Sequence, residues 1–64
     1  MSRESAFDYL KSKIAEERTR AAHNVLSGKV SPTEYNRLCG VIQGLDYTTA
    51  LIDDLAKRME EDNE

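Results

Sequence analysis

The sequence predicts an all-α fold: an antiparallel hairpin of two helices that packs like a coiled coil and self-associates into a helical bundle. Three observations support this prediction. The composition is rich in Ala, Leu, Glu, Lys and Arg, with one proline and three glycines in 64 residues. A strong helix-start signal lies near the middle of the chain. On both sides of it, apolar residues recur every three or four positions, as on one face of a helix.

The start of the second helix is marked by the segment 31–34, Ser-Pro-Thr-Glu. The hydroxyl of Ser31 can cap the helix, and Pro32 takes the first helical position, where its missing N–H costs nothing. Glu34, three residues after Ser31, completes a capping box. We therefore expect a helix over about residues 32–60.

The first helix is expected over about residues 3–27, followed by a turn over residues 28–31. Gly28 follows the last apolar positions and suits the left-handed conformation that ends many helices. A connection this short makes the two helices antiparallel neighbours. Residues 61–64 are mostly acidic, and negative charge at a helix C-terminus opposes the macrodipole, so we expect a frayed tail there. The chain 1–64 is thus a single helical-hairpin domain.

Each helix is expected to pack through one apolar stripe. In the first helix the stripe comprises Phe7, Leu10, Ile14, Ala21 and Val25, with Arg18 close to its middle. In the second helix, alternating steps of three and four are sustained through Tyr35, Leu38, Ile42, Leu45, Thr49, Ile52, Ala56 and Met59. A sustained heptad repeat of this kind is typical of coiled-coil packing.

A second group of residues on the same helix lies outside this stripe. We name it the second seam, and it comprises Gly40, Val41, Gly44, Tyr47, Thr48, Leu51 and Leu55. The two glycines, four residues apart, can form a notch that admits another backbone, although the helix could also merely tolerate them or kink there. An exposed apolar strip on a small protein usually marks a partner surface. The second seam is therefore the expected protein interface.

The size of the chain favours self-association through that interface. A domain of about 60 residues buries only about 60% of its unfolded surface, so its stability alone is marginal. Domains of this size usually rely on a disulfide, a metal or a partner. The chain has one cysteine and no cluster of metal-ligand residues, so we expect a homo-oligomer, most simply a dimer of two hairpins.

The net charge of −3 is unevenly distributed. Residues 1–30 carry six basic and four acidic residues, whereas residues 31–64 carry three basic and eight acidic ones. Antiparallel packing would lay a basic helix beside an acidic one and so favour the hairpin. Within the first helix, Glu16 and Arg20 are spaced to form a favourable pair. Because nucleic-acid-binding domains are usually strongly basic, direct nucleic-acid binding is not expected.

No catalytic, cofactor-binding or metal site is predicted. His23 is the sole imidazole and has no sequence-adjacent carboxylate or cysteine that would suggest a triad or a metal site. Cys39 is the sole cysteine and is expected to behave as a small apolar residue. The lone thiol fits a reducing cytoplasm, and the sequence shows neither a signal peptide nor an apolar run of about 20 residues that could span a membrane.

Three segments resemble small helical proteins of tailed bacteriophages: residues 34–45 (EYNRLCGVIQGL), 51–55 (LIDDL) and 57–60 (KRME). Those phage proteins are mostly uncharacterised and are often encoded among structural genes. The resemblance implies a viral accessory or virion-assembly protein, located in the cytoplasm of the bacterial host cell or associated with the virion. It implies no functional residues.

Two functions therefore compete at this level. The first is a non-enzymatic oligomerisation module that self-associates through the second helix and docks on a larger protein complex. The alternative is a small regulatory binder that inhibits or redirects a host protein through the exposed face of that helix. An enzyme is not expected, because a two-helix hairpin offers neither a pocket nor a catalytic set.

Overall fold

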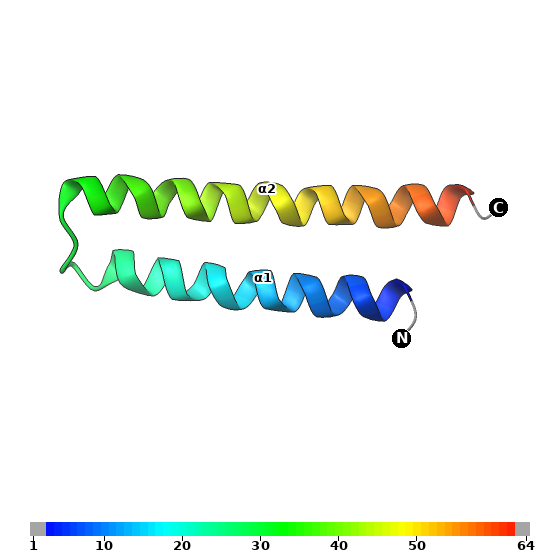
Figure 1. Ribbon diagram of the computed structural model, residues 1–64, viewed down its shortest axis with the longest axis horizontal. Coiled ribbons are helices and arrows are strands. Elements are labelled where there is room, and N and C mark those ends of the chain that lie inside the picture. The colour runs from blue at the N-terminus through cyan, green and yellow to red at the C-terminus, as the bar shows by residue number, and fades with distance from the viewer. Residues whose placement is uncertain (1–2, 63–64) are drawn as a thin grey trace.

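The computed structural model is an antiparallel hairpin of two long α-helices that lie side by side (Figure 1). It describes residues 3–62, with side chains from residue 5 onward. Helix α1 spans Arg3–Leu26 and helix α2 spans Pro32–Asp62, and no strand occurs within the described range. The molecule is a rod with extents of 50 × 18 × 11 Å. The predicted all-α hairpin is thus confirmed for the single chain.

The end of α1 is set by a glycine, as the sequence predicts. Gly28 has a φ of 73°, in the left-handed region that glycine adopts without a Cβ clash. The Ser27 N–H donates to the His23 carbonyl at 3.0 Å, and the Gly28 N–H donates to the Val25 carbonyl at 3.4 Å. These bonds satisfy carbonyls of the last turn, so the helix stops at Leu26, one residue before the expected end.

The start of α2 is capped by Ser31. The Glu34 N–H donates to Ser31 Oγ at 3.2 Å, and the Tyr35 N–H donates to the Ser31 carbonyl at 2.8 Å. A complete capping box would also have the Glu34 side chain accept a hydrogen bond from the Ser31 N–H. The Glu34 carboxylate instead accepts hydrogen bonds from Arg37. The hydrogen bond from Arg37 lowers the pKa of Glu34 below its ordinary value.

The C-terminal end of α2 lies further along the chain than the sequence suggests. The helix continues through Asp62, so residues 61–62 of the expected frayed tail are helical, and residues 63–64 lie outside the described range. The last turn contains no basic residue. One turn earlier, Arg58 Nε lies 2.9 Å from Asp54 Oδ2. The unfavourable end charge is a small cost, and residues of good helix propensity outweigh it.

The contact between the helices is thin. Among the described side chains, the buried ones are Ala21 of α1 and Leu38 and Ile52 of α2. Half-buried residues surround them: Phe7, Ile14, Ala22 and Val25 of α1, and Ile42, Leu45, Thr49, Ala56 and Met59 of α2. The predicted heptad stripe of α2 is therefore correct apart from its first member, because Tyr35 is 48% exposed.

The stripe predicted for α1 is wrong at one position. Leu10 is 46% exposed, and the neighbouring Lys11 is half-buried in its place. The face turned toward α2 follows heptad steps of four and three through Phe7, Lys11, Ile14, Arg18, Ala21 and Val25. Lys11 and Arg18 suit these positions because their aliphatic stems cover apolar surface while their charged ends reach outward.

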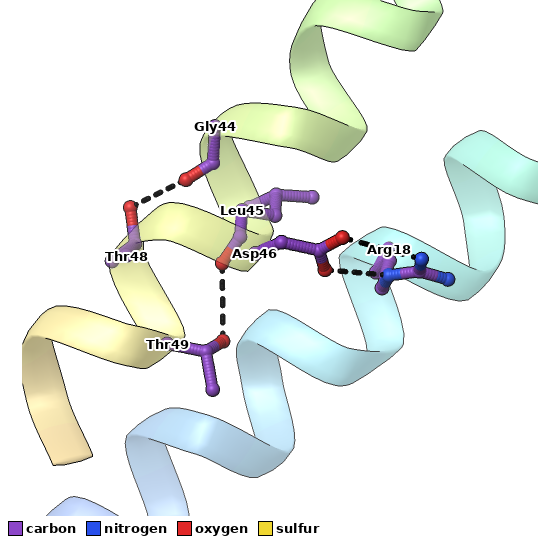
Figure 2. A network of polar contacts seen from close by, with 6 residues as sticks. All are labelled: Arg18, Gly44, Leu45, Asp46, Thr48 and Thr49. Carbon is purple, nitrogen blue, oxygen red and sulfur yellow. Dashed lines mark hydrogen bonds and ion pairs between the residues drawn. The ribbon is translucent and has the colours of Figure 1, made fainter.

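Two ion pairs join the charged ends of these side chains to α2. Arg18 Nε donates to Asp46 Oδ1 at 2.7 Å, and Arg18 Nη2 donates to Asp46 Oδ2 at 3.3 Å (Figure 2). Lys11 Nζ lies 2.9 Å from Asp53 Oδ1. The basic side of α1 thus pairs with acids of α2, as the charge distribution predicts.

Within α1 the observed pairs differ from the expected Glu16–Arg20 contact. Arg20 pairs with Glu17, and Lys13 Nζ lies 3.5 Å from Glu16 Oε2. Both are contacts between residues three apart, which are neighbours on a helix surface just as residues four apart are. Glu16 and Arg20 are therefore both paired within α1, but each with a partner other than the expected one.

Candidate protein interface

The two flanks of the hairpin have opposite character. Each residue turns an α-helix by about 100°. On α2, Asp46 and Asp53 therefore share one flank, where they pair with α1, and the second seam runs along the opposite flank. The ion pairs occupy one side of the helix contact, and apolar side chains extend along the other. The second seam is thus a continuous surface, separate from the contact that forms the hairpin.

Every residue of the second seam is exposed in the single hairpin. Tyr47 is 66% exposed and Leu51 is 50% exposed, and both Val41 and Leu55 are also among the exposed large apolar side chains. The expectation that these residues lie outside the hairpin core is correct. Their role as an interface stays a prediction, because the single chain shows no partner.

The two glycines of the second seam face open space. A Cβ atom added at Gly40 or Gly44 would meet no other atom within 4 Å. Helix α2 passes both positions without a break, and Thr48 Oγ1 donates to the Gly44 carbonyl at 2.8 Å (Figure 2). A glycine inside a helix costs about 1 kcal/mol relative to alanine. Among the described residues, no neighbouring atom requires a glycine at either position.

Helix α1 adds one residue to this flank that the sequence reasoning misplaced. Lys11 points to the ion-pair flank, so Leu10, one step of about 100° away, is turned toward the flank of the second seam. Its exposure is consistent with that placement. The heptad steps through Lys11 and Arg18 were the signal that could have identified Leu10 as a surface residue.

A shallow hollow adjoins the N-terminal end of the second seam. It lies between the helices and is lined by Glu17, Arg20, Ala21, Asn24, Arg37, Leu38 and Val41. Another hollow, near the end of α2, is lined by Asp54, Lys57, Arg58, Glu61 and Asp62. The first is lined by apolar residues as well as polar ones, whereas every residue that lines the second is charged. Only the first is therefore suited to receive an apolar side chain.

The residues with reactive side chains are scattered over the hairpin. His23 is exposed near the end of α1, and Cys39 is half-buried on α2. A hydrogen bond with Cys39 raises the pKa of Tyr35 above its ordinary value. Among the described residues, no three His, Cys, Asp or Glu side chains gather where they could hold a metal ion. Over the same range, neither helix has an apolar stretch of the length needed to cross a bilayer.

Comparisons of the chain with protein-family models, with curated proteins and with solved structures gave no match. What the chain can do is therefore inferred from its own contacts, exposed surface and charge. Of the features described above, the apolar flank formed by the second seam and Leu10 is the one that departs most from an ordinary protein surface.

Proposed function

We propose that this chain is a non-enzymatic oligomerisation module whose second seam binds another copy of the same chain. The proposal is carried by the imbalance between exposed and buried apolar residues. Within the described range, eight large apolar side chains are exposed, whereas the buried residues are Ala21, Leu38 and Ile52. Half of the exposed set belongs to the second seam, so the largest unused apolar surface lies on one flank.

The amount of exposed surface fits a dimer of ordinary size. The chain exposes 5122 Å² of solvent-accessible surface. A compact monomer of 7.3 kDa would expose about 4200 Å². The excess of about 900 Å² per chain is close to the roughly 800 Å² that each partner contributes to a standard interface. A second copy could therefore cover the surface that one hairpin exposes in excess of a compact monomer.

The physical reason for the excess is the two-helix architecture. Each helix of a lone hairpin has one neighbour, so most of its circumference faces water. In a four-helix bundle each helix packs against two neighbours and buries two stripes. Helix α2 carries two such stripes, and its partner within the hairpin covers only the first.

The test is the solution mass of the protein by light scattering across a dilution series, with helicity followed on the same samples. We expect a dimer that dissociates and loses helicity on dilution. Gly44→Leu should abolish dimerisation, even though leucine favours the helix more than glycine does. Ala50→Leu adds bulk at an exposed position of α2 away from the second seam, and it should leave the mass unchanged.

A folded monomer at every concentration would overturn this proposal. That result would instead favour the regulatory binder, whose exposed α2 face is occupied by a different protein. A Gly44→Leu variant that still dimerises normally would show that assembly uses another surface.

The biological setting of the module rests on the resemblance of segments 34–45, 51–55 and 57–60 to phage proteins. On that basis the dimer is an accessory or virion-assembly component in the host cytoplasm or on the virion, where it docks on a larger complex. Mass spectrometry of purified virions and of infected-cell lysate tests this placement. Absence of the chain from both samples would contradict it.

A further inference from the structure

We infer that two copies meet through α2 in antiparallel orientation, with the two-fold axis at Thr48. This inference rests on the proposed function and adds to it the geometry of the interface. It follows from the spacing of the second seam, the sizes of its side chains and the charges at its ends.

The spacing of the second seam is symmetric about Thr48 to within one residue. Its central positions are Val41, Gly44, Thr48, Leu51 and Leu55, which follow one another by steps of three, four, three and four. Val41 and Leu55 each lie seven residues from Thr48, whereas Gly44 lies four residues before it and Leu51 three residues after it. A two-fold axis there would place Val41 level with Leu55 of the second copy, and Gly44 within one residue, about 1.5 Å along the axis, of Leu51 of the second copy. Each contact would occur twice, as an isologous dimer requires.

The side-chain sizes fit this pairing. Gly44 has open space above it, with no atom within 4 Å of an added Cβ, whereas Leu51 projects from the surface and is 50% exposed. Antiparallel packing brings the large side chain of one copy over the small residue of the other, which fills space at both. Parallel packing in register would instead set Gly44 against Gly44 and Leu51 against Leu51, so that the large side chains face each other.

The hollow beside Val41 provides a place for the next side chain. Val41, Leu38 and Ala21 contribute its apolar part. In the antiparallel arrangement, Leu55 of the second copy arrives at Val41 and can enter this hollow. Burial of Leu55 would then link the α2–α2 contact to the existing contact between α1 and α2.

The charges of α2 favour the same orientation. Its last turn carries acidic residues and no basic one, whereas Arg37 lies near its N-terminus. With the axis at Thr48, the acidic end of one copy lies level with the first turns of the other. The acids then meet the positive end of a helix macrodipole and the guanidinium of Arg37, which also pairs with Glu34 of its own helix. Parallel packing would bring the two acidic ends together, where like charges repel.

Disulfide trapping distinguishes the two orientations. Each cysteine is introduced in a Cys39→Ser background, whose dimer mass is checked against the unmodified chain. Thr48→Cys faces its own counterpart in either orientation and should cross-link in both. Leu51→Cys lies about 9 Å along the axis from its own counterpart in the antiparallel dimer. That separation exceeds the usual Cα–Cα range of about 4.4–6.8 Å for a disulfide, so Leu51→Cys alone should not cross-link.

The decisive sample is a mixture of Gly44→Cys and Leu51→Cys chains. The antiparallel dimer predicts a disulfide between these two different chains, at least tenfold above the amount formed by Leu51→Cys alone. Ala50→Cys, exposed away from the second seam, measures the background of random collisions. Leu51→Ala introduced into the Gly44→Leu chain should restore dimerisation, because it exchanges the large and small sides of the contact.

The outcomes separate this inference from the proposed function. A dimeric mass with efficient cross-linking of Leu51→Cys to itself would overturn the antiparallel geometry and leave the dimer intact. A dimeric mass with no cross-link at Thr48→Cys would overturn the position of the axis. A monomeric mass for the unmodified chain would overturn both the geometry and the proposed function.

Discussion

Arg18 of α1 and Asp46 of α2 form a two-bond ion pair that bridges the helices, with Nε–Oδ1 at 2.7 Å and Nη2–Oδ2 at 3.3 Å (Figure 2). Lys11 and Asp53 repeat the contact one heptad away on both helices, at 2.9 Å. Two pairs with the same spacing are satisfied together in one alignment of the helices. A slip of either helix would separate both pairs at once, so the pairs help to set the register of the hairpin.

Reversal of the charges should show that Arg18 and Asp46 stabilise the hairpin through one shared interaction. Arg18→Asp and Asp46→Arg alone each place like charges across the helix contact, and each should lower the midpoint of thermal unfolding. The double variant restores an opposite-charge pair and should recover most of the loss, because the two changes act on one interaction. Circular dichroism at one fixed protein concentration measures the unfolding midpoint of the unmodified chain, the two single variants and the double variant. A double variant as unstable as the sum of the two singles would contradict the coupling.

Acidification should weaken the same contact. The hydrogen bond from Arg18, and secondarily its positive charge, hold the pKa of Asp46 below its ordinary value of 3.8. Because the folded pKa is the lower one, this pair stabilises the hairpin above pH 3.8, and the contribution is lost as the pH falls through the folded pKa. Thermal unfolding followed from neutral pH into this acidic range should show the loss.

Asp46→Asn supplies the control for this pH dependence. Asparagine is uncharged throughout, so the midpoint of the variant should fall less on acidification than that of the unmodified chain. The other carboxylates are common to both proteins, so the difference between the two curves isolates Asp46. Parallel curves would show that the pair makes no contribution to the pH dependence.

The turn should depend on glycine at position 28. Gly28→Ala forces a Cβ atom into the left-handed conformation, which costs about 1–2 kcal/mol for an L-residue. Gly28→Asn is the matched control, because asparagine adopts this conformation more readily, and its loss should be smaller. Urea unfolding of the three chains at equal concentration measures the difference. A free energy of unfolding unchanged by alanine would contradict the role of the left-handed turn.

Adjacent residues of α2 should have separable effects. Ile52 is buried in the helix contact, so Ile52→Ala should cost about 2–5 kcal/mol, comparable with the whole stability of a domain this small. Leu51 is exposed on the second seam, so Leu51→Ala should weaken dimerisation but regain full helicity at protein concentrations high enough to restore the dimer. Circular dichroism and light scattering on both variants distinguish the two effects. Equal loss of helicity in concentrated samples, where the dimer is populated, would contradict the assignment of separate surfaces.

The sequence by itself determined the helices and the turn between them. The cap at Ser31 and the left-handed Gly28 depend on hydrogen bonds between residues only a few positions apart, so short segments carry the whole signal. The heptad repeat of α2 could also be predicted from the sequence, because its steps of three and four are sustained over the length of the helix. These features follow from interactions between residues close in the sequence. A segment with the same residues would have the same local geometry in another chain.

Only the tertiary structure decided which residues of α1 face α2. Leu10 and Lys11 are adjacent, and hydrophobicity alone favours Leu10 in the contact, yet the alignment with α2 places Lys11 there and leaves Leu10 exposed. The choice of Asp46 and Asp53 as partners depends on that same alignment. Such choices involve residues distant in the chain, and they follow from how the two helices together bury apolar stems and pair charges. A stripe on one helix cannot specify them, because its partner surface is needed to complete the contact.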